Sequence, residues 1–157
     1  AASTQTWECG NPGNHSLGPG SGKTGVWATN LNGNYAADES GYFASPALDL
    51  SNCGEQTVSL TIRHWFNFEG GVQNTDGAVV QVATSDPESE ASWTTIEPTG
   101  GTLYIANINA GWVESVSDIT SYAGGTEFYV RFVMGSDGST EQGGWYIDDV
   151  EILGSGG

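Results

Sequence analysis

Residues 143–154 read Gly-Gly-Trp-Tyr-Ile-Asp-Asp-Val-Glu-Ile-Leu-Gly, and the apolar pattern of this stretch is the most informative in the chain. Its apolar residues fall on odd positions before the two aspartates, at Trp145 and Ile147, and on even positions after them, at Val150 and Ile152. Because side chains alternate between faces along a strand, the core-facing phase slips by one residue at the aspartate pair. A β-bulge inserts one extra residue into a strand and accommodates such a slip. The stretch therefore predicts a closing strand with a bulge.

The two aspartates of this stretch, Asp148 and Asp149, are also candidate ligands of a hard cation. A bulge can turn carboxylates sideways, off the faces of the sheet, and carboxylate oxygens suit Ca²⁺. The alternative interpretation is a solvated acidic turn in a very acidic protein. No complete ligand loop is visible around the pair, so the stretch alone leaves both interpretations open.

Composition indicates a single all-β domain. The 157 residues suit one domain with a real core, and they include 24 glycines, six tryptophans and six tyrosines. No long segment has helical periodicity. We predict one module over residues 1–153 and a linker-like tail over 154–157. Both ends have the composition of linkers, as expected for a monomeric module within a longer chain.

Three segments carry the clearest strand patterns. Residues 58–68 and 128–134 alternate between apolar and polar side chains, and residues 78–84 follow a turn signal and read as the returning strand of a hairpin. Short strands with turns about every 8 to 12 residues predict a two-sheet antiparallel β-sandwich of jelly-roll topology. Weaker strand candidates lie at residues 93–96, 102–106 and 112–116, with a helical turn at 118–122.

The first third of the chain is read as loop. Residues 7–42 are rich in glycine and asparagine, and Pro46 favours an edge position before residues 47–50, because proline cannot donate to a β-ladder. His64 falls on the apolar face of its predicted strand, where a hydrogen-bonded core histidine is favoured over a catalytic one.

Charge excludes two classes of partner. The chain has 19 acidic against three basic residues, a formal net charge of −16. Binding to nucleic acid or to an anionic membrane depends on clustered lysine and arginine, which this sequence lacks. No stretch approaches the roughly 20 apolar residues of a membrane span. We therefore expect neither nucleic acid as a partner nor insertion into a membrane.

The two cysteines, Cys9 and Cys53, favour a disulfide in an extracellular setting, because their number is even and no Cys/His metal spacing is present. The bridge would close a loop of about 45 residues and contribute on the order of 4 kcal/mol in the chain-entropy treatment. Two separate buried thiols are the alternative.

Catalysis by this module is not expected. The sequence contains no Gly-x-Ser-x-Gly, His-Glu-x-x-His or phosphate-binding loop. Glu69 and Asp76 would face each other across the predicted hairpin as a carboxylate pair for glycoside hydrolysis. Acidic surface loops explain these two residues equally well.

The polar faces of the predicted strands favour carbohydrate binding. A sugar ring packs its C–H face on an aromatic side chain, and planar donors bond its hydroxyls. We predict one sheet surface that presents Arg63, Trp65, Asn67, Gln81, Tyr129 and Arg131 as ligand-binding residues. The alternative is that the arginines pair with acids such as Glu127 while loops cover the tryptophan. A further candidate surface, at one end of the sandwich, is a loop cluster of Trp93, Tyr104 and Trp112.

An ordered set of motifs runs through nearly the whole chain: residues 27–35, residues 45–51, Asp76-Gly77, residues 117–124, Arg131-Phe132 with Ser136-Asp137, and residues 144–150. In this order they resemble the jelly-roll module of the MAM and immune-inhibitor-A type, which is related to cleaved-adhesin domains. Such modules are appended to secreted bacterial proteases and surface proteins. The resemblance implies an extracellular, non-catalytic accessory module.

The resemblance also implies a structural calcium ion between the N-terminal segment and the last strand. That site would pair Glu8 with Asp148 or Asp149, with Asp38 and Asp49 as weaker additions. We expect a secreted or surface-located, calcium-stabilised adhesion module that binds extracellular carbohydrate. The alternative is a structural or protein-binding appendage that supports a neighbouring protease domain.

Overall fold

The structure, a computed structural model, describes residues 7–13, 25–37, 40–54, 56–68, 77–97, 112–136 and 142–155. These residues form nine strands and three short 3₁₀ turns. The strands are β1 (Glu8–Gly10), β2 (Val26–Ala28), β3 (Ser40–Ala44), β4 (Thr57–Asn67), β5 (Gly77–Ala83), β6 (Thr94–Glu97), β7 (Val113–Asp118), β8 (Tyr129–Gly135) and β9 (Gly144–Ser155). The turns are η1 (Ser51–Cys53), η2 (Glu90–Ser92) and η3 (Thr120–Tyr122).

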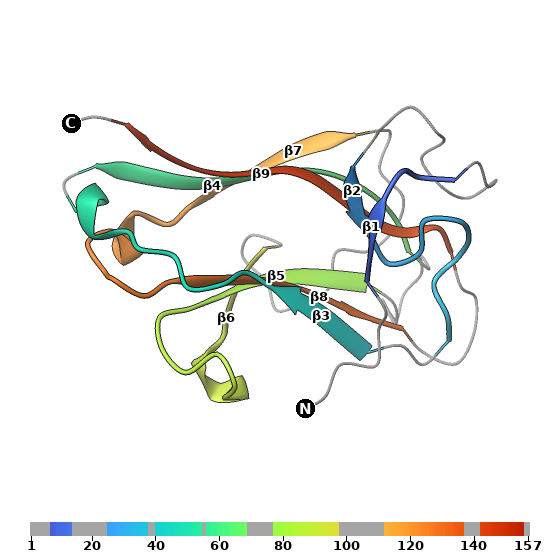
Figure 1. The fold of residues 1–157 in the computed structure, drawn as a ribbon, viewed down its shortest axis with the longest axis horizontal. Helices are drawn as coiled ribbons and strands as arrows, with labels where there is room; N and C mark the ends of the chain where they lie inside the picture. The colour runs from blue at the N-terminus through green and yellow to red at the C-terminus, as the bar shows by residue number, and fades with distance from the viewer. Residues whose placement is uncertain are drawn as a thin grey trace.

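The strands pair into two antiparallel sheets that lie face to face as the layers of a sandwich (Figure 1). The five-stranded sheet has the order β1-β2-β9-β4-β7, and the four-stranded sheet has the order β3-β8-β5-β6. The predicted all-β jelly-roll sandwich is confirmed. None of the described helical turns is long and apolar enough to cross a membrane.

Two sequence predictions about the strands are wrong. β4 and β5 belong to different sheets, so residues 58–68 and 78–84 do not form a hairpin. Their alternation is the same in a hairpin and in a crossover between layers, because both strands face one core. The loop expected at residues 7–42 contains β1, β2 and part of β3, which are too short for a recognisable alternation.

The core fills the space between the inner faces of the two sheets. β9 contributes Trp145 and Ile147, which are fully buried. Trp145 lies against Phe132 of β8 across the core, with ring centroids 5.7 Å apart. Other buried core residues alternate along the neighbouring strands: Leu60, Ile62, Val80, Val82, Val130 and Met134. The apolar phase of each long strand therefore marks its inner face.

β9 carries the predicted bulge. Thr61 of β4 lies opposite Glu151, whereas Arg63, two residues on, lies opposite Asp148, three residues back. One extra residue of β9 is thus inserted at this point. Asp149 has a φ of +48°, a left-handed conformation that interrupts the extended backbone of the strand at the bulge. After the bulge, Ile152 again packs against the core, as the phase slip predicts.

His64 is a hydrogen-bonded core histidine. Its side chain is 3% exposed, its Nδ1 accepts a hydrogen bond from Trp145 Nε1 at 3.0 Å, and its Nε2 lies 2.8 Å from Ser115 Oγ. Because Nδ1 is an acceptor, the neutral ring carries its proton on Nε2, which donates to the serine. Burial lowers the pKa of His64 to about 4.

Gly144, the first residue of β9, has a φ of +94°, and a Cβ atom there would lie 2.1 Å from Thr29 Oγ1. Gly144→Ala should lower the free energy of unfolding by about 2 kcal/mol, measured by urea denaturation. Two costs add: the backbone strain of alanine at a positive φ, and the displacement of the Thr29 side chain. Gly54→Ala is the matched control: Gly54 has a φ of −60°, and its Cβ would meet an ordinary contact at 3.7 Å. A loss at Gly54 equal to that at Gly144 would contradict the explanation.

The predicted disulfide is wrong. Cys9 lies on β1 and Cys53 in the turn η1, at opposite ends of the sandwich (Figure 1), and both are free thiols. A bridge requires Cα atoms within about 7 Å. The even number of cysteines carries no information about this separation.

Thiol titration with a chromogenic disulfide should therefore count two thiols in the unfolded chain without prior reduction. In the folded chain the exposed Cys9 should react first, and Cys53, which is partly buried, more slowly. Cys9→Ser should remove the fast phase. An unfolded chain without free thiols would contradict the structure.

Candidate functional site

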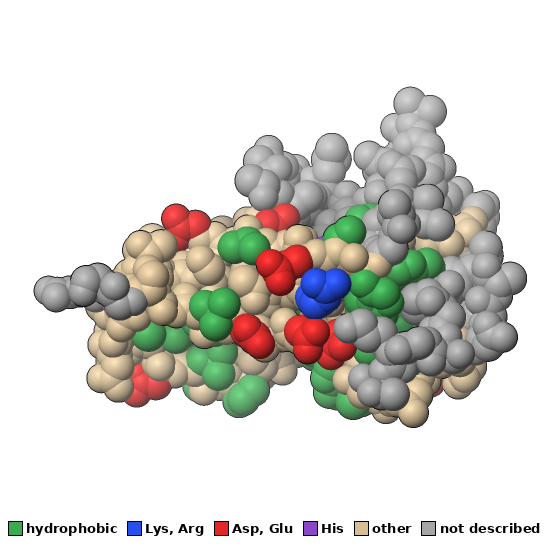
Figure 2. Space-filling view, turned by 90° about the horizontal axis from the view of Figure 1, so that it is seen from above, with side chains coloured by type: hydrophobic (Ala, Val, Ile, Leu, Met, Phe, Trp, Pro, Cys, Tyr) green, Lys and Arg blue, Asp and Glu red, His purple; other side chains and the backbone are tan. Residues whose placement is uncertain are grey.

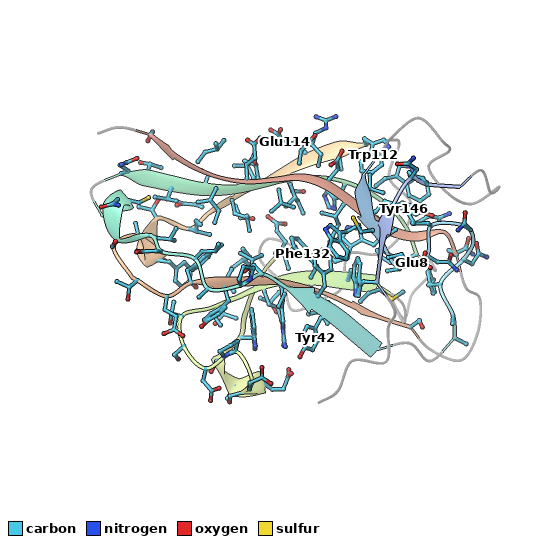
Figure 3. All side chains as sticks on the ribbon, in the orientation of Figure 1. Glu8, Tyr42, Trp112, Glu114, Phe132 and Tyr146 are labelled. Atoms are coloured by element: carbon cyan, nitrogen blue, oxygen red, sulfur yellow. The ribbon has the colours of Figure 1, made fainter. Side chains whose placement is uncertain are left out.

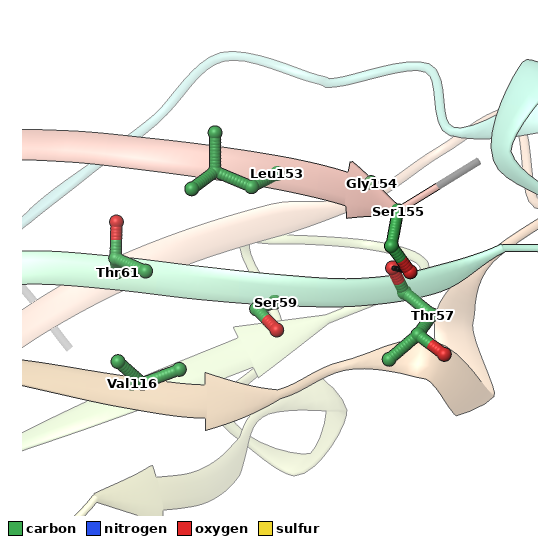
Figure 4. A pocket seen from close by; sticks show the side chains of 7 residues that line it. All are labelled: Thr57, Ser59, Thr61, Val116, Leu153, Gly154 and Ser155. Atoms are coloured by element: carbon green, nitrogen blue, oxygen red, sulfur yellow. Dashed lines mark hydrogen bonds between the residues drawn. The ribbon is translucent and has the colours of Figure 1, made fainter.

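A shallow groove on the outer face of the five-stranded sheet is the candidate ligand site. It has a volume of about 310 Å³. Strands β4, β7 and β9 form it, with side chains that Figure 4 shows at close range. The lining residues are Thr57, Ser59, Thr61, Val116, Leu153, Gly154 and Ser155. Ser155 Oγ donates a hydrogen bond to the Thr57 carbonyl oxygen at 3.3 Å and links the two strands at one end.

The groove exists because short side chains on the central strand lie between longer ones. Thr57, Ser59 and Thr61 alternate with the core residues of β4 and face outward. On either side, Val116 of β7 and Leu153 of β9 are 57% and 51% exposed. The floor therefore offers hydroxyl groups that donate and accept hydrogen bonds, and the walls offer aliphatic surface.

Charged side chains continue the same face beyond the groove. Arg63 follows Thr61 on the outer face of β4, and its cross-strand partners are Glu114 of β7 and Asp148 of β9. Figure 2 shows a basic side chain surrounded by acidic ones on this face, and Figure 3 places Glu114 on the outer side of the sheet. Donors and acceptors thus lie close together at this end of the groove.

Two other predicted ligand residues of β4, Trp65 and Asn67, are buried. Trp65 packs edge-on against Tyr146, with ring centroids 5.7 Å apart, and Trp112 packs against the same small cluster. A buried ring has no free face for a sugar. Trp65 and Asn67 are therefore not exposed to a ligand, and the burial of Trp65 agrees with the alternative interpretation, in which this tryptophan is covered.

The prediction of one shared ligand surface is wrong. Arg63, Trp65 and Asn67 belong to the five-stranded sheet, whereas Gln81, Tyr129 and Arg131 belong to the four-stranded sheet on the opposite side of the sandwich. The expected cluster of loop aromatics fails for the same reason: Trp93 lies beside Arg131, and Trp112 on the other sheet. Alternation identifies outward residues but does not say to which sheet they belong.

Arg131 serves as a structural clamp on the four-stranded sheet. Its Nη atoms donate to both carboxylate oxygens of Glu90, at 3.1 and 2.8 Å, and its Nε donates to Gln81 at 2.8 Å. The guanidinium also lies 4.8 Å from the Tyr42 ring centroid and 4.4 Å from that of Trp93. The hydrogen bonds from Arg131 hold the pKa of Glu90 below its usual range. Arg131 thus pairs with an acid, as the alternative proposed, but with Glu90 instead of Glu127, which accepts from Tyr129.

The four described residues of the predicted calcium site, Glu8, Asp49, Asp148 and Asp149, do not form one ligand set. Glu8 Oε2 accepts a hydrogen bond from the Leu31 backbone N–H at 2.7 Å. Burial and the negative charge of Glu8 raise the pKa of Tyr146. Asp49 instead accepts from the Ser51 N–H at 2.9 Å beside η1, at the other end of the sandwich. Within the described ranges, no three His, Cys, Asp or Glu side chains come together as metal ligands. Of the predicted calcium ligands, Asp148 and Asp149 are adjacent to each other on β9.

Four predicted positions, Asp38, Glu69, Asp76 and Tyr104, lie outside the described residues. The hydroxyl groove was missed by sequence reasoning, although the signal was present. Thr57, Ser59 and Thr61 form a run of small polar residues on the outward phase of a long strand. The walls could not be foreseen, because they depend on the register with β7 and β9.

Comparisons with known proteins support a modular origin. No family model matches the sequence. Over 154 residues the chain is 31% identical to Bacillopeptidase F of Bacillus subtilis (strain 168), a match that covers 97% of this chain but 10% of that protein. The chain thus spans about a tenth of the length of this curated relative.

The fold has a counterpart among solved structures. The K3 cleaved adhesin domain of Lys-gingipain from Porphyromonas gingivalis W83 superposes with a TM-score of 0.50 at 17% identity, over 93% of this chain and 90% of that one. The likeness shows the sandwich fold. The expected relation to cleaved-adhesin domains therefore holds at the level of the fold, and the MAM and immune-inhibitor-A type stays a prediction.

Proposed function

We propose that this chain is a non-catalytic accessory module of a secreted or surface-located bacterial protein, and that it binds neutral extracellular polysaccharide in the groove along β4. The observation that carries the proposal is the hydroxyl floor between two aliphatic walls, with Arg63 next on the same face. The similarity of nearly the whole chain to one tenth of a bacterial peptidase supports the modular role.

The chemistry of the groove favours a neutral polysaccharide. Serine and threonine hydroxyls can exchange hydrogen bonds with sugar hydroxyls, and Val116 and Leu153 can cover the C–H faces of a ring. Uronic acids and sulfated sugars are disfavoured, because Glu114, Asp148 and Glu151 surround this end of the sheet in a protein of net charge −16. The groove lies on an open face, so a sugar chain can pass through it.

Affinity gel electrophoresis against a panel of neutral and acidic polysaccharides tests the proposal. Ser59→Phe fills the floor of the groove and should reduce binding at least ten-fold, and Arg63→Gln should weaken it by a smaller factor. Thr94→Phe, at an exposed position of β6 on the other sheet, is the matched control and should bind normally. Binding that survives Ser59→Phe, or no binding to any polysaccharide, would overturn the glycan assignment.

The second candidate is a module that supports a neighbouring protease domain through protein contacts. The similarity to a segment of Bacillopeptidase F favours it. The same panel separates the two candidates, because a protein-contacting module should leave every polysaccharide unbound. Its own test is a melting measurement on the parent protein, in which Val116→Lys or Leu153→Lys should destabilise the neighbouring domain and leave the isolated module unchanged.

The proposed module also binds Ca²⁺. Its candidate protein ligands are the carboxylates of Asp148 and Asp149 at the bulge. If the pair binds Ca²⁺, a chelator should lower the melting temperature of the wild-type module, and Asp149→Asn should lower it equally and abolish the chelator effect. Asparagine adopts the left-handed conformation as readily as aspartate, so the bulge itself tolerates the change. Identical melting curves for both proteins, with and without chelator, would count against calcium.

A further inference from the structure

A second opening lies between the two sheets, on the side where β3 and the second half of β9 form the borders. It encloses about 290 Å³ and is lined almost entirely by apolar side chains. The inner part is formed by Leu60, Phe132 and Ile152, and the outer part by Trp27, Phe43 and Val150. Its size is near the lower end of ligand pockets and suits one large apolar side chain.

The mouth of this opening is apolar and partly aromatic. Trp27 is 40% exposed and Val150 is 44% exposed, although both are large hydrophobic residues. Trp27 stacks on Phe43 with ring centroids 4.8 Å apart, and Phe43 stacks on Phe132 at 4.9 Å. A continuous aromatic wall therefore runs from the surface into the sandwich, so the pocket is preformed.

One sheet edge borders the opening. β2 pairs with β9 at Tyr146 and Ile147, before the bulge. From Glu151 to Ser155, β9 pairs with β4 on one side, and no other strand within the described part of the chain continues the ladder on the side of β2. A strand added there, in line with β2, would direct alternate side chains into the space between the sheets.

The electrostatic surroundings select the partner. The exposed Asp149 directly precedes Val150, and the exposed Asp49 directly follows Leu48, and both of these apolar neighbours line the pocket. Of the two described basic residues, Arg131 is buried on the four-stranded sheet and Arg63 faces the outer side of the other. Exposed carboxylates thus flank the pocket lining along the chain, whose formal net charge is −16, and they complement a partner that carries lysine or arginine.

We propose that this opening binds an extended, basic segment of a partner protein, which adds as a strand to β9 from Val150 to Ser155 and places one large apolar side chain in the pocket. Backbone hydrogen bonds to the edge supply affinity, the pocket selects the apolar residue, and the carboxylates select the flanking cations. The site is separate from the groove along β4 and lies between the layers, whereas the groove lies outside them.

Synthetic nine-residue peptides provide the probe. A peptide in which lysine and valine alternate around a central tryptophan should bind the intact module with a micromolar Kd, measured by calorimetry, and should weaken as salt is raised. Replacing the central tryptophan by glycine should reduce affinity at least ten-fold, and replacing every lysine by glutamate should abolish binding. Equal binding of the lysine and glutamate peptides, or none at millimolar concentration, would overturn the proposal.

Variants of the module locate the binding site. Ala44→Trp fills the mouth of the pocket from β3 and should abolish peptide binding, whereas Ser59→Phe in the outer groove should leave it unchanged. Hydrogen exchange gives a second readout that needs no variant: amides of residues 150–155 should gain protection when the peptide binds. Protection confined to β7 would overturn the proposal, as would concentration-dependent dimerisation through this edge in sedimentation, which would identify a second copy as the occupant.

Discussion

Trp145→Ala is expected to lower the free energy of unfolding by about 3 to 5 kcal/mol, a large fraction of the stability of a single domain. Trp145 is fully buried at the centre of the core. Its ring contacts Phe132 across the sandwich and Trp7 at a centroid separation of 6.0 Å, and its Nε1 donates to His64. Alanine would leave a large cavity and would remove the donor to the buried His64 Nδ1.

Urea denaturation of two further variants separates these contributions. Trp145→Phe keeps an aromatic ring but removes the donor to His64, so it should cost less than alanine and more than 1 kcal/mol. Val116→Ala, at an exposed position on the outer face, should change stability by less than about 0.5 kcal/mol. Comparable losses from Trp145→Ala and Val116→Ala would contradict the assigned core.

Acidification is expected to destabilise the protein through His64. Its pKa is about 4 in the folded chain against 6.5 for the free side chain, because burial disfavours the charged ring. As the pH falls, His64 is therefore protonated in the unfolded chain at a higher pH than in the folded chain. The contribution of His64 to the free energy of unfolding is fully present above pH 6.5. It is lost as the pH falls from 6.5 to 4, by about 3 kcal/mol in total.

The test is the free energy of unfolding in urea at steps between pH 7 and pH 4.5. A His15→Gln background leaves His64 as the single imidazole of the chain. In that background His64→Gln should flatten the pH dependence, because glutamine can both accept from Trp145 and donate to Ser115 without titrating. Glu90, whose pKa Arg131 holds low, loses its contribution only at more acidic pH. A slope that persists without His64 would contradict the assignment.

The closing stretch shows how far sequence reasoning reaches. A shift of the apolar phase at two aspartates predicts a bulge, and the structure places an extra residue and a left-handed Asp149 there. The same alternation identifies the core faces of β4 and β8 and a core His64. These inferences succeed because each depends on one strand and on which side of it is apolar.

The failures concern relations between strands. Arg63 and Arg131 both face outward, yet they lie on opposite layers, and Cys9 and Cys53 lie at opposite ends. The groove along β4 needs Val116 and Leu153 beside Thr61, which only the register supplies. The alternation of residues within one strand does not indicate which strands pair with it or in which register. A site formed by three strands could therefore not be predicted from the sequence of one strand.

The position of β9 determines when the module can assemble. This strand is the last in the described chain, yet it lies in the middle of the five-stranded sheet, where β2 and β4 pair on either side of it. Until it has emerged from the ribosome, the pair formed by β1 and β2 has no further strand to join. Folding therefore cannot proceed from the first residues onward, and a chain that stops before Gly144 would leave the five-stranded sheet divided into two separate pairs, β1-β2 and β4-β7, and exposed to proteolysis.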